Sequence, residues 1–344
     1  MKEIIYPLST EDSDLRQEPS SYILCEMSSK TGVSQGLLAF ISIDSVIQNR
    51  ILKNEKTYPK KQHKILGSFL SEKIQKKPIL LTYDRQFEDL NFFKKSEPDV
   101  VFCSEEITYR LWQITDHDKV RRLSAHLNAI DQFVVADGHH RLAAITQYYL
   151  NKSGINKPKF LAFIMEKNEI SLQGFNKLLT GLNLSNQQLI EKMSNYFNIN
   201  KLEKFEGFTL EKPAIYLEKN WFVFSLKNEL KTSAHLTISA NYVHCFLIEK
   251  ILGITSNEIE EKVISINHDL SYKFLEQSVN NGRYQSALFI PSIKGDEFIN
   301  HIQSGYLFPQ NTTYFSPKIN HDLFSFFLQK QIMGLDLQKI ESVA

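Results

Sequence analysis

The stretch at residues 131–150, DQFVVADGHHRLAAITQYYL, decides how the rest of the chain is arranged. It begins at 133–136 with an apolar run whose length and β-branched content are typical of a buried strand. The pair Asp137-Gly138 then predicts a tight turn. From Arg141 onward, apolar residues recur at roughly helical spacing, and two alanines favour a helix. The sequence therefore predicts a strand, a turn and a helix in direct succession.

Polar and flexible residues fill that turn without interruption: Asp137, Gly138, His139, His140 and Arg141. The N-terminus of a helix presents free N–H groups and a partial positive charge, which suits a phosphate. Gly138 lets the backbone approach a ligand closely because it has no side chain. An aspartate before a helix is also a common N-cap, and glycine beside it is common turn chemistry. Because ligand sites in α/β folds favour the carboxyl ends of strands, we expect a functional site here.

Composition indicates a folded protein of the reducing cytoplasm. The 344 residues are 42% hydrophobic and carry a net charge of +1, so no global field draws the chain to nucleic acid or a membrane. Cys25, Cys103 and Cys245 are far apart and odd in number, so neither a metal site nor a disulfide framework is expected. We also expect no signal peptide and no membrane-spanning segment.

Strand and helix patterns alternate along the chain and predict a mixed α/β fold. The first half is expected to contain strands at 21–28, 36–43, 78–83, 108–114 and 158–165, and helices at 44–47, 65–74 and 117–127. The second is expected to contain helices at 185–197 and 241–252, paired strands at 214–226 and a strand at 287–290. Gly253 is the expected C-cap of the helix at 241–252.

Four blocks of the sequence resemble, in order, a known family, the domain of unknown function 1015. They are GLLAFISIDSVIQNRILKNEKT (36–57), similar to its KxHExT segment; ADGHHR (136–141), similar to its signature; VHCFLIEKILGI (243–254), similar to its LHxLLLEPLLGI; and FPQNTTYFSPK (308–318), similar to its closing MPxKSTYFxPK. That family looks related to the free serine kinases of the ParB/sulfiredoxin superfamily. The resemblance implies a ParB/sulfiredoxin-like core in residues 1–184 and a smaller α+β domain in 185–344.

The resemblance also implies an activity: transfer of phosphate from ATP or ADP to free L-serine, giving O-phosphoserine. Glu55 falls on the glutamate of the KxHExT motif, the position of the proposed base in the related kinases. On its own, Glu55 is typical of an exposed loop residue. Asp137 would hold Mg²⁺, a hard cation that prefers oxygen ligands. Gly138 to Arg141 would contact nucleotide phosphates, and the hydroxyls of Thr312 and Thr313 would reach a phosphate or substrate.

The chain departs from the family pattern in several places. Asn54 replaces the usual histidine, Lys64 stands about where arginine is frequent, and Asn311 replaces the typical lysine. The segment at 175–182 resembles the family's YNR helix start, which implies a helix start here, but Lys177 replaces its arginine. No counterpart of the family's N-terminal Pro-Pro-Tyr-Asp motif is found. These departures leave open a catalytically degenerate member that binds nucleotide or regulates. His244, alone on its predicted helix, is expected to be structural.

Other classes fit less well. A sulfiredoxin-type reductase needs a cysteine in the signature, where this chain has His139 and His140. A DNA-binding switch needs a helix-turn-helix and a basic face; the basic run at 50–77 lacks the interleaved aromatic residues of a nucleic-acid surface. A metal hydrolase built on Asp137 and both histidines stays open, although adjacent histidines on a helix diverge. The expected partners are therefore a nucleotide and a small amino acid, with the oligomeric state left open.

Overall fold

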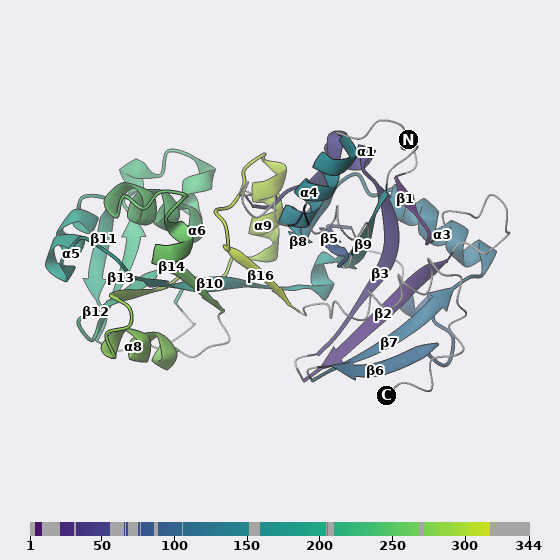
Figure 1. Ribbon diagram of the computed structural model, residues 1–344, viewed down its shortest axis with the longest axis horizontal. Helices are drawn as coiled ribbons and strands as arrows, with labels where there is room; N and C mark the ends of the chain where they lie inside the picture. The colour runs from purple at the N-terminus through teal and green to yellow at the C-terminus, as the bar shows by residue number, and fades with distance from the viewer. Residues whose placement is uncertain are drawn as a thin grey trace. The chain divides into compact units, whose positions relative to one another are not determined.

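The computed structural model describes residues 4–8, 21–30, 32–55, 65, 67, 75, 77–85, 89–104, 106–150, 159–203, 205, 210–267 and 272–316. Contacts within the chain divide it into unit 1, residues 1–171 and 315–344, and unit 2, residues 172–314. Each unit combines a sheet with helices, so the fold is mixed α/β as predicted (Figure 1). The expected helix at 65–74 lies almost wholly outside the described residues. The domain boundary expected at 184/185 stays a prediction.

Unit 1 is built around one mixed sheet. Its strands are β1 (Ile5–Tyr6), β2 (Tyr22–Ser29), β3 (Gly32–Ser42), β4 (Ile51–Leu52), β5 (Ile79–Tyr83), β6 (Val100–Ser104), β7 (Ile107–Ile114), β8 (Phe133–Asp137) and β9 (Lys159–Glu166). Its helices are α1 (Asp44–Ile47), η1 (Leu90–Phe93), α3 (His117–Asn128), α4 (His139–Leu150) and η2 (Lys167–Glu169). Over the described residues the strand order is β4-β8-β5-β9-β3-β2-β7-β6, with β1 added beside β3.

The core of unit 1 forms where α3 and α4 pack on this sheet. Leu24 of β2 and Phe133 of β8 are fully buried, and they share one hydrophobic cluster with Leu127 of α3 and Leu142 of α4. Each buried side chain of this size stabilises the folded state by about 1.5–3 kcal/mol relative to the same side chain exposed to water. The first four residues of β8 are buried, which explains their continuous apolar sequence. This packing fixes the position at which β8 ends and α4 begins.

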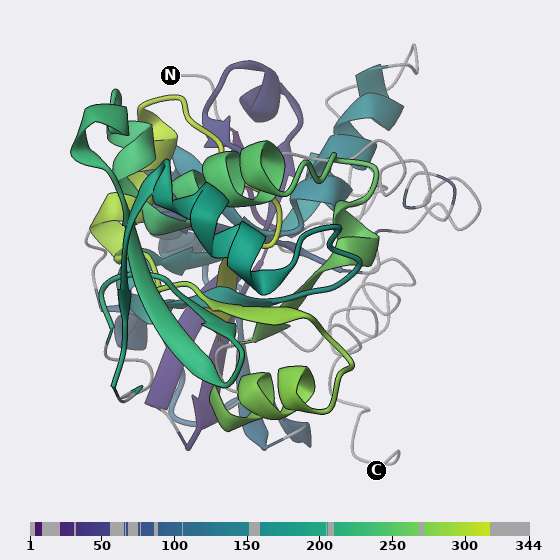
Figure 2. The same ribbon diagram turned by 90° about the vertical axis from the view of Figure 1, so that its left-hand side faces the viewer.

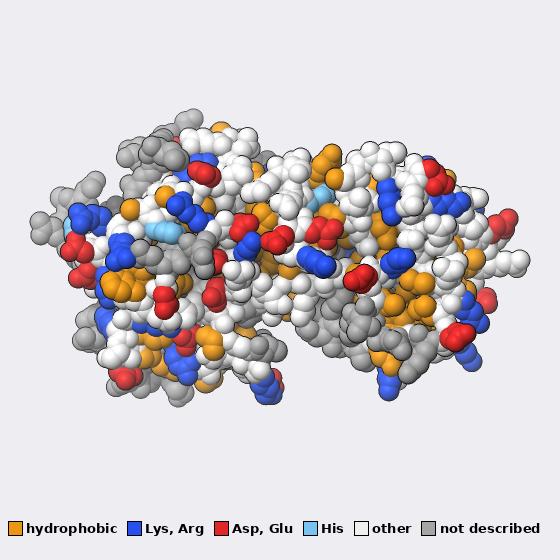
Figure 3. Space-filling model, turned by 180° about the vertical axis from the view of Figure 1, so that it is seen from behind, with side chains coloured by type: hydrophobic (Ala, Val, Ile, Leu, Met, Phe, Trp, Pro, Cys, Tyr) orange, Lys and Arg blue, Asp and Glu red, His pale blue; other side chains and the backbone are white. Residues whose placement is uncertain are grey.

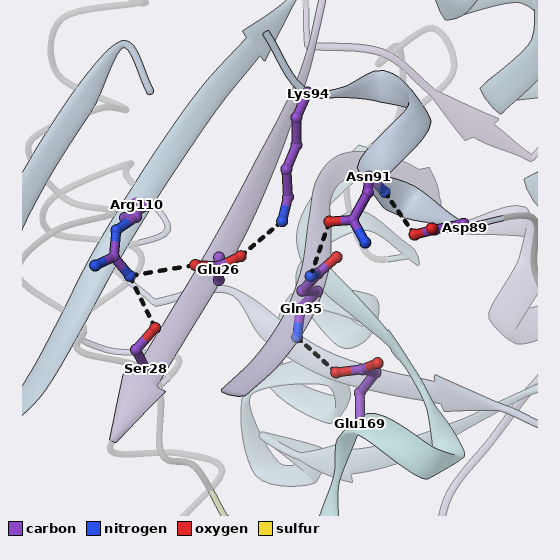
Figure 4. Close-up of polar contacts among 8 residues, drawn as sticks. All are labelled: Glu26, Ser28, Gln35, Asp89, Asn91, Lys94, Arg110 and Glu169. Carbon is purple, nitrogen blue, oxygen red and sulfur yellow. Dashed lines mark hydrogen bonds and ion pairs between the residues drawn. The ribbon is translucent and has the colours of Figure 1, made fainter. Parts of the chain in front are cut away.

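The same sheet face becomes polar toward one end of β2. Glu26 lies two residues after Leu24, on the same face, and Figure 4 shows it between Lys94 and Arg110. Its carboxylate accepts from Lys94 Nζ at 2.6 Å and from Arg110 at 3.2 Å. Nearby, Glu169 accepts from the Gln35 N–H at 2.8 Å, and burial raises the pKa of Glu169 above its ordinary value. Paired charges therefore replace apolar packing at this end of the sheet.

Unit 2 contains a second sheet, antiparallel in its recorded pairings. Its strands are β10 (Ser171–Leu179), β11 (Phe197–Lys201), β12 (Ala214–Leu217), β13 (Asn220–Leu226), β14 (Val263–Asn267), β15 (Ser286–Phe289) and β16 (Thr313–Ser316). The order among described residues is β11-β13-β12-β15-β10-β14, with β16 beside β10. Its helices are α5 (Asn186–Ser194), η3 (Asn228–Leu230), η4 (Ala234–Thr237), α6 (Ser239–Tyr242), η5 (Val243–Ile251), α7 (Ile259–Lys262), α8 (Tyr272–Asn280) and α9 (Gly295–Gln303). Figure 2 shows these elements from the side on which α5 lies nearest the viewer.

Two sequence predictions need correction in unit 2. The helix start implied at 175–182 is wrong, because residues 175–179 belong to β10 and pair with β14 and β15. The expected helix at 241–252 exists, but it is α6 followed by η5, a π-helix, so its winding differs from the predicted α-helix. Gly253 follows it with φ of +65°, as expected of a C-cap glycine. In the first case the resemblance implied a helix start, but pairing with distant strands makes these residues a strand.

Surface properties agree with the near-neutral composition. On the face that Figure 3 shows, acidic and basic side chains are interspersed, without a broad area of one sign. Within the described part of the chain, no helix combines the length and apolar character that crossing a membrane requires. Arg50 belongs to the basic run at 50–77 and has a structural role. Its guanidinium donates hydrogen bonds to the carbonyls of Asn128, Ile130 and Asp131.

Candidate functional site in unit 1

The pairing of β4 with β8 brings Glu55 to the end of the signature strand. The two strands run parallel, with Ile51 opposite Phe133 and Leu52 opposite Val134. Glu55 follows Leu52 by three residues, and Asp137 follows Val134 by three. Since parallel strands advance at the same rate, both carboxylates reach the same edge of the sheet. This pairing brings Glu55 toward the carboxyl end of β8, where it lies 3.7 Å from His139.

Glu55 is buried at this edge. Only 3% of the residue is exposed, so the expectation of an exposed loop glutamate is wrong. Its Oε2 lies 3.7 Å from Nε2 of His139, whose side chain is 15% exposed. A carboxylate removed from water is costly unless polar groups surround it, and His139 provides one such group. The structure thus places a buried carboxylate beside the first residue of α4.

The turn after β8 has an unusual backbone. Gly138 has φ of +94°, a conformation that residues with side chains rarely adopt. Between Leu80 and Leu81 of β5, the pairing with β8 shifts register in a β-bulge next to Asp137. Bulges re-aim side chains and are over-represented beside active sites. Both features direct the chain out of the sheet and into α4.

The helix begins at His139, two residues before the position at which helical spacing becomes visible in the sequence. The Gly138 carbonyl accepts from the Leu142 N–H at 2.8 Å, which makes Gly138 the N-cap residue. The rings of His139 and His140 lie with centroids 4.5 Å apart, and both residues are in the first turn. Both can therefore contribute to binding at this N-terminus, together with its backbone N–H groups.

Asp137 and Arg141 form an ion pair across the turn. Arg141 donates from one terminal nitrogen to Asp137 Oδ2 at 2.7 Å. The Asp137 side chain is 56% exposed, whereas that of Arg141 is 17% exposed. The pair therefore holds the guanidinium over the glycine turn and leaves the carboxylate accessible from solvent.

Asp137 is an exposed carboxylate at this turn that is available as a metal ligand. Among the described residues, no group of three or more His, Cys, Asp or Glu side chains forms a metal centre. Mg²⁺ commonly binds through one or two carboxylates and keeps waters and substrate phosphates as its other ligands. The exposed Asp137 carboxylate fits a Mg²⁺ ion that arrives with a nucleotide.

The other predicted site residues lie in unit 2. Thr312 and Thr313 are buried, at 7% and 9% exposure, and the Thr312 hydroxyl donates to the Pro309 carbonyl at 2.6 Å. Their predicted contact with a phosphate or substrate stays a prediction. Lys177, noted in the sequence only as a departure from the family pattern, is also buried in unit 2. No local signal marks it, because a lysine in a strand is usually solvated.

The structure describes the surroundings of two residues that depart from the family pattern, Asn54 and Asn311. Asn54 is 1% exposed, so the residue replacing the family's histidine is buried next to Glu55 in the chain. Asn311 has φ of +52°, and its carbonyl accepts from Lys177 Nζ at 2.6 Å. Lys64 lies outside the described residues.

Comparison with known proteins gives a family and a set of similar folds. No curated protein matches the sequence. Among solved structures, a free serine kinase variant in complex with ADP has 13% identity and a TM-score of 0.46, covering 81% of this chain and 87% of that one. A conserved hypothetical protein from Pyrococcus furiosus has 14% identity and a TM-score of 0.44, covering 82% and 92%. C-terminally truncated SbnI from Staphylococcus aureus has 13% identity and a TM-score of 0.43, covering 86% and 95%.

A family profile matches this sequence over residues 10–247, a span that contains Glu55 and the whole strand–turn–helix segment at 133–150. The same span reaches into unit 2 as far as η5, so the match is not limited to the signature. The chain belongs to the family described as Protein of unknown function (DUF1015).

Proposed function

We propose that this protein is a nucleotide-dependent kinase of a small molecule, which transfers phosphate from ATP or ADP to the hydroxyl of free L-serine. One observation carries the proposal. The buried Glu55 carboxylate lies 3.7 Å from His139, at the N-terminus of α4. A candidate base and a candidate phosphate-binding helix end are therefore adjacent, which is the pairing that phosphoryl transfer requires.

In the proposed reaction, the serine hydroxyl oxygen attacks the terminal phosphorus of the nucleotide. The bond between that phosphorus and its bridging oxygen breaks, and the shortened nucleotide leaves. Glu55 accepts the proton from the hydroxyl, and His139 keeps the carboxylate oriented through their contact. Positioning and charge neutralisation supply most of the rate enhancement in such transfers.

Phosphate binding falls to the residues of the turn. The N–H groups at the start of α4 and the side chains of His139, His140 and Arg141 would donate to phosphate oxygens. Mg²⁺, if bound through Asp137, would neutralise charge on the transferred phosphoryl group. Thr312 and Thr313 remain proposed contacts for the phosphate or the substrate.

The test is formation of O-phosphoserine, followed by mass spectrometry, with ATP and with ADP in the presence of Mg²⁺. Glu55→Gln keeps the shape of the side chain but cannot accept the proton, so turnover should fall by about 10²-fold or more while nucleotide still binds. Glu169→Gln is the matched control, because it neutralises a partly buried glutamate of unit 1 that has no role in the proposed reaction. If the wild-type protein forms no product with either nucleotide, the kinase proposal fails. If Glu55→Gln retains wild-type turnover, Glu55 is not the base.

Two further variants separate binding from chemistry. Asp137→Asn removes the accessible carboxylate, so both Mg²⁺ dependence and nucleotide affinity should decrease. His140→Ala should weaken phosphate binding without unfolding the protein, because the backbone donors of α4 remain. Calorimetric titration with nucleotide measures both effects.

A second function is supported by the departures near the site. Asn54, buried where the family has histidine, and the Asp137–Arg141 pair, which occupies one carboxylate oxygen, favour a member that binds nucleotide without turnover. Stoichiometric nucleotide binding with no O-phosphoserine product would support this regulatory role over the kinase.

A further inference from the structure

Two arginine side chains bind the connection between α3 and β8. Carbonyls at the C-terminal end of a helix lack partners within the helix, and the helix dipole favours a cation there. Arg85, which follows β5, donates to the Ala129 carbonyl at 2.8 Å. Arg50 donates to three neighbouring carbonyls, which belong to Asn128 (3.1 Å), Ile130 (2.6 Å) and Asp131 (3.3 Å). Every carbonyl from 128 to 131 therefore accepts a hydrogen bond from one of the two arginines.

Arg50 differs from Arg85 because its backbone also joins this connection to the signature strand. The Arg50 carbonyl accepts from the Phe133 N–H at 2.8 Å, at the residue directly before β4. The Arg50 N–H donates to the Ser45 carbonyl of α1 at 2.9 Å. One residue thus contacts α1, the end of α3 and the first residue of β8.

The shortness of β4 makes these contacts important for Glu55. β4 has only two residues, and Glu55 follows it by three positions. A pairing of two residues provides few hydrogen bonds to hold the segment against β8. Hydrogen bonds from a charged donor are roughly twice as strong as those between neutral groups. The guanidinium of Arg50 therefore adds its strongest anchoring at the N-terminal end of the segment that leads to Glu55.

We propose that Arg50 is a positioning residue for Glu55, because it fixes β4 against the connection before β8 and so holds the Glu55 carboxylate 3.7 Å from His139. For phosphate transfer this inference rests on the proposed function, in which Glu55 is the base. Misplacing a reacting group by about 1 Å lowers a rate by about 10²-fold. Loss of the Arg50 side chain should therefore reduce turnover. Nucleotide affinity should stay unchanged, because the proposed phosphate contacts lie on the turn after β8 and on α4.

The first experiment is a double-mutant cycle, with turnover measured as O-phosphoserine formation and nucleotide affinity measured by calorimetry. Arg50→Met removes the guanidinium and keeps the backbone contacts. Turnover should fall by about tenfold to 10²-fold, with nucleotide affinity within about twofold of wild type. In the Glu55→Gln background, Arg50→Met should lower turnover no further, because the group that it misplaces has already lost its function. Equal losses in both backgrounds would overturn the proposal.

Two control variants separate positioning from general stability. Arg85→Met removes the other, exposed arginine from the same connection but leaves β4 and its contacts in place, so turnover should not change. Arg50→Lys keeps the charge but lacks the planar fork that reaches three carbonyls, so it should restore only part of the turnover lost in Arg50→Met. A loss in Arg85→Met as large as that in Arg50→Met would contradict a role specific to Arg50.

Hydrogen exchange tests the placement of the segment without any reaction. Amides of residues 50–55 should exchange at least about tenfold faster in Arg50→Met than in wild type or Arg85→Met, because charged hydrogen bonds are lost. If the wild-type protein forms no O-phosphoserine, the kinase proposal fails, and this exchange decides the positioning role by itself. If Arg50→Met does not fold, Arg50→Lys should still show faster exchange at 50–55 than wild type. Wild-type exchange in the folded Arg50 variant would overturn the proposal.

Discussion

Substitution of Gly138 by alanine tests the geometry of the turn after β8. At φ of +94°, a residue with a side chain is strained by about 1–2 kcal/mol. Part of this cost is offset, by about 0.4–1 kcal/mol, because alanine restricts the unfolded chain. The backbone alone should therefore cost at most about 1.5 kcal/mol, which corresponds to at most about 3–6 °C in Tm for a domain of this size.

The added methyl group has a second effect, on Arg141. Its carbon would lie 2.7 Å from one terminal nitrogen of the guanidinium and 2.9 Å from Nε, both closer than contact allows. Because these atoms are the far end of a flexible side chain, the guanidinium should move, and its 2.7 Å contact with Asp137 should break. A partly exposed ion pair contributes at most about 1 kcal/mol, so stability changes little further. Nucleotide binding should suffer more, because Arg141 is displaced from its proposed place beside the phosphates.

Gly305→Ala is the matched control. Gly305 has φ of +83°, and a methyl group there would meet no atom within 4 Å. Both variants should lose similar stability in thermal unfolding, but only Gly138→Ala should lose nucleotide affinity, by about tenfold or more in calorimetry. Unchanged nucleotide affinity in Gly138→Ala would refute the proposed role of this turn. A stability loss exceeding that of Gly305→Ala by more than about 2 kcal/mol would show that Arg141 is rigidly packed, contrary to the reasoning.

Two further predictions concern stability. Glu26→Gln should lower the free energy of unfolding by about 1–3 kcal/mol, measured by denaturant titration, because Lys94, whose side chain is 14% exposed, loses its charged partner. Glu106→Gln is the control, because both side chains of its ion pair are at least 76% exposed. This variant should lower the free energy of unfolding by less than about 1 kcal/mol. Burial, with a smaller contribution from His235, lowers the pKa of His301 from 6.5 to about 4. The folded state therefore favours the neutral ring, and stability should decrease as the pH falls from 6.5 toward 4. His301→Gln should show a shallower decrease over this window, and an identical slope would contradict the assignment.

The local chemistry of the signature segment made it predictable from sequence. β8 and α4 form where the apolar run and the alanine-rich segment indicate, and the turn falls at Gly138 as expected. The hairpin of β2 and β3 and helix α3 were likewise predictable, because each carries its own periodic pattern. The start of α4 was predicted at Arg141, two residues after its actual start at His139, because His139 and His140 are not part of the periodic apolar pattern.

The burial of Glu55 was not predictable, because it depends on a non-local contact. Only two residues of β4, Ile51 and Leu52, pair with β8, and so short a strand gives no periodic signal. Without that pairing, Glu55 is one charged residue in a polar segment. At 175–182 the family resemblance implied a helix start, but Phe175 to Leu179 become a strand through partners in β14 and β15 that lie at least about 84 residues later.

Lys177 and Asn311 show how far two departures from a family pattern can depend on each other. From sequence, Lys177 keeps the positive charge of the arginine it replaces, whereas Asn311 removes the charge of the family's typical lysine. In the structure the two positions touch, and the contact runs from Lys177 Nζ to the backbone carbonyl of Asn311, not to its side chain. Loss of a lysine at 311 therefore leaves this anchor intact. Asparagine also tolerates φ of +52° better than lysine does, so the substitution relieves strain at the residue that holds Lys177 in place. On this reasoning, Asn311→Lys should destabilise unit 2 by about 1 kcal/mol through backbone strain, not strengthen the site.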